Sequence, residues 1–129
     1  MSYYISTTLK NTAFKDAIEK TTAALKKEGF GVLTEIDLKA TLKKKLDADF
    51  YNYTILGACN PEMAYQALQA ENKIGTMLPC NVIVQERESG IIEISAVDPA
   101  ASMIAVENNS LGDIAKEVQM KLAKVIQSI

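Results

Sequence analysis

Apolar residues alternate with polar or small residues in several short stretches of the chain, as expected for strands that bury one face. These stretches cover residues 3–9, 30–38, 51–58, 81–87 and 91–97. Only Glu88, Ser89 and Gly90 separate the last two stretches. This spacing predicts a β-hairpin with a short turn.

Between the first two strands, apolar residues recur at helical spacing over residues 14–25, with charged residues on the opposite side. Asn11 or Thr12 could cap the N-terminus of this helix through a side-chain oxygen. Gly29 stands where the residue just past the helix end adopts a left-handed conformation. The pattern therefore predicts a helix that ends immediately before Gly29.

Two further helices follow later in the chain. Pro61 suits the first position of a helix, with Asn60 as its N-cap. Ser110 and Asp113 resemble a capping box at the start of a long amphipathic helix that runs to the C-terminus. Residues 40–46 are predicted to be a short helix or a loop.

The predicted order is strand, helix, two strands, helix, two strands, helix, or β-α-β-β-α-β-β-α. Segregated hairpins with helices indicate the α+β class, with a mostly antiparallel sheet and the helices packed on one face. The length of 129 residues and the apolar content of 48% suit one domain, covering residues 1–129. No disulfide is needed to stabilise a core of this size.

Composition excludes several functions. The chain has no histidine, which removes Ser-His-Asp catalysis and histidine ligation of zinc or haem. Its two cysteines cannot complete a four-thiolate zinc site within one subunit, so no metal is assigned to the chain, although a site shared across a dimer stays open. A net charge of −2 gives little attraction to nucleic acid, and no apolar run approaches a membrane span. We expect a cytoplasmic protein with reduced thiols.

Cys59 and Cys80 are the candidate reactive thiols. Cys59 lies just before the helix at Pro61, where backbone N–H groups could stabilise a thiolate. Cys80 follows a proline at the start of a strand, which suits a buried structural residue. Asn60 and Asn81, which follow the two cysteines, are candidate ligand-binding residues, although each could equally bond local backbone at a turn or cap.

Three other side chains could bind a ligand. Alternation over residues 30–38 places Glu35 and Asp37 on one strand face, opposite an apolar face. The two carboxylates could act as an acid and a base, or as ligands of a hard metal ion, if that face lines a pocket, or they could simply face solvent. Tyr51 and Tyr53 share a strand side, where they could line the pocket or pack against a helix.

Five short motifs occur in order along the chain: Gly29-Phe30-Gly31-Val32, Glu35-Ile36-Asp37, Ile55-Leu56-Gly57-Ala58-Cys59-Asn60-Pro61, Leu78-Pro79-Cys80-Asn81-Val82 and Asp98-Pro99. Taken together, they resemble the motifs of the domain of unknown function 302 family of small bacterial and archaeal proteins. The resemblance covers nearly the whole chain. It implies an α+β fold of the TATA-binding-protein-like class and homodimers, and it implies no established reaction.

These observations favour a homodimeric module that binds a small molecule in a pocket near Cys59 and the helix that follows it. A thiol-dependent redox protein or enzyme, using Cys59 and Cys80, is one alternative. A purely structural or interaction domain is another. The residues indicate binding rather than catalysis, and they identify neither a cofactor nor the ligand.

Overall fold

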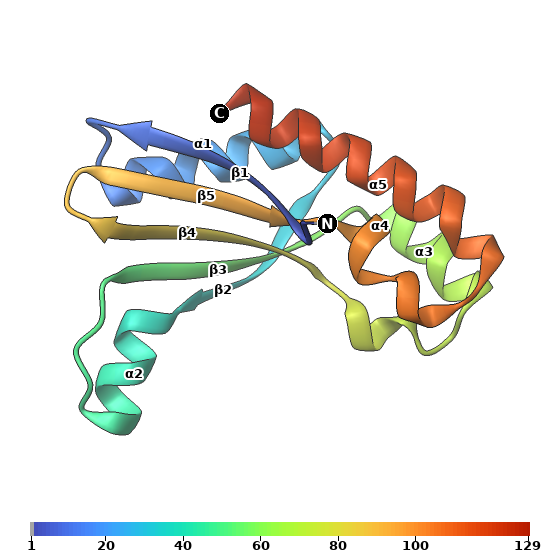
Figure 1. The fold of residues 1–129 in the computed structure, drawn as a ribbon, viewed down its shortest axis with the longest axis horizontal. Coiled ribbons are helices and arrows are strands. Elements are labelled where there is room, and N and C mark those ends of the chain that lie inside the picture. The colour runs from blue at the N-terminus through green and yellow to red at the C-terminus, as the bar shows by residue number, and fades with distance from the viewer. Residues whose placement is uncertain (1) are drawn as a thin grey trace.

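The computed structural model describes residues 2–129 of the chain (Figure 1). In chain order the elements are β1 (Tyr4–Lys10), α1 (Phe14–Lys27), β2 (Gly31–Asp37), α2 (Leu38–Leu46), β3 (Asn52–Cys59), α3 (Pro61–Ala70), the short 3-10 helix η1 (Ile74–Met77), β4 (Cys80–Glu88), β5 (Ile91–Val97), α4 (Pro99–Ser102), the 3-10 helix η2 (Ile104–Val106) and α5 (Asn109–Ser128).

The five strands form one antiparallel sheet in the order β1-β5-β4-β3-β2. Helices α1 and α5 cover one face of this sheet, and the other face carries no helix (Figure 1). The predicted α+β class is therefore confirmed. The element order differs in detail, because α2 lies between β2 and β3 and α4 precedes α5.

The core lies between the sheet and the two covering helices. Alternate residues of the central strands, such as Val82, Val84, Ile92 and Ile94, are completely buried there against Leu122 of α5. Each such side chain stabilises the fold by about 1.5–3 kcal/mol relative to an exposed position. A smaller cluster of Ala67, Ile74 and Leu111 holds α3 and η1 to the start of α5.

Helix α1 ends as predicted. Gly29 has a φ of 87°, and its N–H donates to the Lys26 carbonyl, while Phe30 N–H donates to the Leu25 carbonyl. Its beginning differs from the prediction, because Ala13 is the N-cap and no side chain caps the helix. Asn11 is itself in a left-handed turn with a φ of 56°, two residues too early to cap.

The predicted capping box of α5 is also wrong. Asn108 is the N-cap, and its Oδ1 accepts a hydrogen bond from Ser110 N–H at 2.9 Å. Its Nδ2 donates to the Ala70 carbonyl at 3.0 Å and to Glu71 Oε1 at 3.2 Å. The asparagine amide can do both because it carries an acceptor and two donors. It thereby ties the start of α5 to the end of α3.

A β-bulge in β2 overturns the predicted faces of Glu35 and Asp37. Val32 lies opposite Ala58, whereas Thr34 lies opposite the adjacent Gly57, so the residue between them is an insertion in the ladder. The extra residue reverses the alternation. Ile36 therefore lies opposite Ile55 on the face of the sheet away from α1 and α5, which we call the open face.

Glu35 and Asp37 lie on the same side of the sheet as the helices, but both remain exposed because the helices do not extend over this edge strand. Asp37 has a local role. Its Oδ1 accepts a hydrogen bond from Ala40 N–H at 2.9 Å and so caps α2. Neither carboxylate faces a cavity.

Gly57 allows the open face of the sheet to close against the chain that leads into β4. A Cβ at position 57 would lie 2.8 Å from Pro79 Cγ and would also meet the Thr34 hydroxyl. Gly57→Ala should therefore destabilise the protein by about 1–3 kcal/mol, as overpacking commonly does. Urea unfolding would measure the change. Gly75→Ala is the matched control, since nothing lies within 4 Å of its added Cβ, and equal midpoints for the two variants would contradict the prediction.

Candidate functional site

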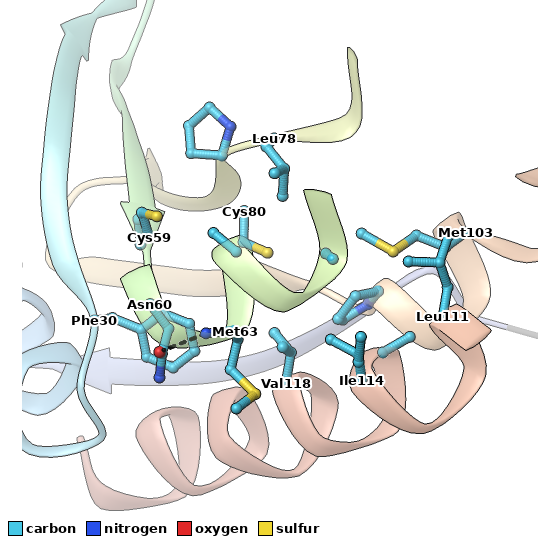
Figure 2. Close-up of a pocket in the computed structure, with 16 residues that line it drawn as sticks. Phe30, Cys59, Asn60, Met63, Leu78, Cys80, Met103, Leu111, Ile114 and Val118 are labelled. Atoms are coloured by element: carbon cyan, nitrogen blue, oxygen red, sulfur yellow. Dashed lines mark hydrogen bonds between the residues drawn. The ribbon is translucent and has the colours of Figure 1, made fainter. Parts of the chain in front are cut away.

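A small apolar cavity lies where β3 ends and where β4 and α3 begin (Figure 2). Its volume is about 30 Å³. The side chains that surround it come from both strands, from α3, from the α4 region and from α5, and nearly all of them are apolar. They are Phe30, Ala58, Cys59, Asn60, Met63, Ala64, Ala67, Leu78, Pro79, Cys80, Pro99, Met103, Leu111, Ile114, Ala115 and Val118.

Strand pairing and a helix cap position the cysteine side of this cavity. Ala58 of β3 lies opposite Cys80 of β4, and Cys59 is one residue beyond this ladder while it still pairs with Gly31 of β2 on the other side. The chain then turns into α3 at Asn60, whose Oδ1 accepts a hydrogen bond from Met63 N–H at 3.2 Å (Figure 2). Pro61 occupies the first helical position. The predicted cap and helix start are confirmed.

The two thiols differ in environment. Cys59 is half-buried and Cys80 is buried, and neither forms a disulfide. Burial, with a smaller contribution from the neighbouring Cys59, raises the pKa of Cys80 to about 11. Cys80 is therefore a neutral thiol at physiological pH, which makes it a poor nucleophile.

Four sulfur atoms lie around the cavity. Two belong to Cys59 and Cys80, and two belong to Met63 of α3 and Met103 after α4 (Figure 2). Thioethers are polarisable and flexible, so methionines fill irregular space and adapt to what they contact. The cavity wall therefore favours soft, uncharged groups by dispersion.

The start of α3 does not offer an anion site. Pro61 has no N–H, and the Met63 N–H already bonds to Asn60. Glu62 in the first turn adds a negative charge at the same end. No carboxylate or ammonium group lines the cavity among the described residues, so it contains no acid–base pair.

The structure separates the candidate residues into three places. Asn60, Cys59 and Cys80 lie together at the cavity. Tyr53 and Asn81 lie on the open face of the sheet, where they line a wider groove. Glu35 and Asp37 are at the sheet edge and belong to neither. Within residues 2–129, no three histidine, cysteine or acidic side chains gather as a metal site would require.

The contribution of α5 and of the two methionines to the cavity carries no distinct signal in the sequence. Apolar residues of α5 that line the cavity, such as Ile114 and Val118, follow the same helical spacing as those that fill the core. Periodicity cannot distinguish the two roles, because both require an apolar face.

Comparison with known proteins supports the fold and the motifs. The family model described as "Domain of unknown function DUF302" matches residues 5–129. The chain belongs to the DUF302 family. Its structure is similar to the crystal structure of an uncharacterized conserved DUF302 protein from Bacillus stearothermophilus, with a TM-score of 0.89 and 28% sequence identity. The match covers 98% of each chain.

No curated protein matches the DUF302 chain. Across residues 2–129, none of its helices has the length and apolar character needed to cross a bilayer. The family assignment therefore gives the fold, and the site must be interpreted from its own chemistry.

The two thiols should react at very different rates. An alkylating reagent at pH 8 should modify Cys59 first, because it is partly exposed, and should leave Cys80 unmodified until the protein unfolds. The raised pKa of Cys80 acts in the same direction, since the thiolate forms only as the pH approaches about 11. Peptide mass spectrometry would give both rates.

Labelling in urea provides the control, because both thiols should then react at similar rates. Equal rates in the folded protein would contradict the prediction. A reversible Cys59–Cys80 disulfide would instead support the thiol-dependent alternative.

Proposed function

We propose that this DUF302 chain is a homodimeric binding module that takes a small, uncharged, apolar ligand in the cavity beside Cys59 and α3. The observation that carries the proposal is the cavity itself, with its apolar wall and its four sulfur atoms. An apolar cavity in a protein stays dry and can bind apolar molecules or xenon. The residues that line the cavity include no acid–base pair, so they give no support to an enzymatic reaction there.

The size of the cavity limits the ligand. A volume of about 30 Å³ is close to that of one or two water molecules, so an occupant larger than a few atoms must displace side chains. Met63 and Met103 are the side chains best able to move, because they are unbranched and have three rotatable bonds. We therefore propose that ligand entry requires a change of methionine rotamers.

The thiol-dependent alternative has weaker support. Cys80 is buried and its pKa is raised, so it is poorly suited to attack a second sulfur. Both cysteines are free, which fits a reducing compartment, and we propose the cytoplasm as the site of action.

The ligand-binding proposal can be tested with xenon. Xenon pressure should produce saturable shifts in the NMR signals of residues around the cavity, such as Met63 and Val118. Ala115→Leu, which places extra carbon atoms in the cavity wall, should abolish these shifts. Ala23→Leu is the matched control on the exposed side of α1, and it should leave them unchanged.

Shifts that grow linearly with pressure, or that persist in Ala115→Leu, would show that the cavity does not bind. Native mass spectrometry of the protein purified from its own cells would then reveal whether a natural ligand is retained. A retained mass that is absent from Ala115→Leu would identify the physiological occupant.

The homodimer part of the proposal rests on exposed apolar residues at one edge of the sheet. Leu33 and Ile36 of the edge strand β2 are 67% and 44% exposed, and Leu46 of α2 is 71% exposed. Helix α2 has no buried residue and extends from the end of the sheet (Figure 1). A helix of this length is marginal in water on its own. We propose that a second subunit covers this edge.

Light scattering at micromolar concentration should give the mass of two chains. Replacing both Ile36 and Leu46 with lysine should shift the protein towards the monomer, because two charges would enter the apolar contact. Replacing the exposed Tyr65 of α3 with lysine is the control, and it should keep the dimer. A monomeric mass for the unmodified protein would end the dimer proposal.

A further inference from the structure

The open face of the sheet carries a groove that the cavity beside Cys59 does not include. Its volume is about 430 Å³, within the usual range for small-molecule sites. It lies across β1, β5, β4 and β3, on the face away from α1 and α5 (Figure 1). The residues that line it are Tyr3, Tyr4, Tyr53, Asn81, Ile83, Gln85, Glu93, Ser95, Ala96 and Val97.

Strand register assembles one polar row across the floor of this groove. Tyr53 of β3 lies opposite Gln85 of β4, and Gln85 lies opposite Glu93 of β5. Gln85 Nε2 donates a hydrogen bond to Glu93 Oε1 at 3.0 Å. This bond fixes the carboxylate in the groove. No hydrogen bond or ion pair between described residues uses the second carboxylate oxygen of Glu93.

Three tyrosines line the groove: Tyr53 lies in this row, whereas Tyr4 lies opposite Val97, four residues along β5 from Glu93, with Tyr3 beside it. The rings of Tyr3 and Tyr4 meet edge to face, with centroids 5.1 Å apart. Burial raises the pKa of the Tyr53 phenol, and the nearby Tyr51, Tyr3 and Glu93 raise it further. The phenol therefore stays neutral at physiological pH, and its ring presents a negative π face.

The charge of the groove has one sign. Glu93 is the one carboxylic acid among the described residues that line it, and none of these residues is a lysine or an arginine. Arg87 lines a neighbouring groove that also includes Gln85 and Glu93, yet no ion pair joins Arg87 to Glu93 among the described residues. Within the lining of the groove itself, an anion would meet the Glu93 carboxylate and no lysine or arginine.

We infer that this groove binds a small organic cation, an amine or quaternary ammonium group, held by the Glu93 carboxylate and the face of the Tyr53 ring. Aromatic faces attract cations through the ring quadrupole, and quaternary ammonium groups are recognised in this way in other proteins. The carboxylate supplies the opposite charge. A neutral ligand of the same shape would lose the electrostatic contribution of both features, and an anion would be repelled by the carboxylate.

Asn81 and the Ser95 hydroxyl give the rest of the ligand polar contacts. Ser95 is buried and shares a hydrogen bond of 2.6 Å with the Ser6 hydroxyl, while Asn81 is exposed at the end of the groove. A hydroxyl or carbonyl near the cation could therefore bond at this end. The β2 edge proposed for the dimer contact contributes no residue to the groove, so the two proposals are independent.

Choline and its uncharged carbon analogue 3,3-dimethyl-1-butanol test this inference directly, because they share shape and differ in charge. Titration of the full chain followed by NMR should show saturable shifts at Tyr53, Gln85 and Glu93 with choline. The uncharged analogue should bind at least about fivefold more weakly, the factor that corresponds to a single exposed cation–π contact.

Three variants assign the binding to the groove. Glu93→Gln keeps the acceptor for Gln85 but removes the charge, and it should weaken choline binding about tenfold. Tyr53→Leu should weaken it about fivefold, whereas Tyr53→Phe, which keeps the ring, should bind as the unmodified chain does. Thermal unfolding and the binding of xenon in the Cys59 cavity report whether each variant is folded.

Equal binding of choline and its uncharged analogue would overturn the inference, as would unchanged binding by folded Glu93→Gln. Absence of saturation by choline would do the same. If the groove signals instead shift when the protein is diluted, a second copy of the chain occupies this face and the inference fails. Failure of xenon binding alone would leave this inference standing and would reject only the cavity.

Discussion

Strands β3 and β4 pair along their common length, with Tyr53 opposite Gln85 near one end and Ala58 opposite Cys80 at the other. This single register places Tyr53 and Gln85 on the open face and turns Ala58 and Cys80 towards the helices. Because side chains alternate with a period of two, a slip of one residue would exchange the two faces. Both the cavity and the groove would then lose their walls, so the chemistry of the molecule depends on this one pairing.

The two sites differ because they face different surroundings. The cavity lies between the sheet, α3 and α5, and its wall is made almost entirely of hydrocarbon and sulfur. The opposite face has no such cover and tolerates hydroxyl, amide and carboxylate groups, as one face of an antiparallel sheet commonly does. A five-stranded sheet covered on one side thus places an apolar cavity and a polar groove within a few residues of each other along β4.

The sequence predicts a structural feature correctly where residues close together in the chain determine it. Gly29 ends α1 and Asn60 caps α3 because each depends only on the residues next to it. The sequence does not predict features that depend on contacts between residues far apart in the chain. Asn108 starts α5 partly through bonds to the end of α3, and the bulge in β2 appears only when β3 is paired beside it. The grouping of Tyr53 with Glu93 likewise needs the strand register, so no pattern within either strand could predict it.

The bulge in β2 also affects whether a strand from another molecule can pair with this edge of the sheet. An edge strand exposes unpaired N–H and C=O groups, and a regular one can template the strand of another molecule. In β2 the insertion at Leu33 breaks the spacing of these groups midway along the strand. An added strand could follow the ladder on one side of the break only. The exposed edge therefore offers apolar side chains for contact while its backbone resists extension into a continuous fibre.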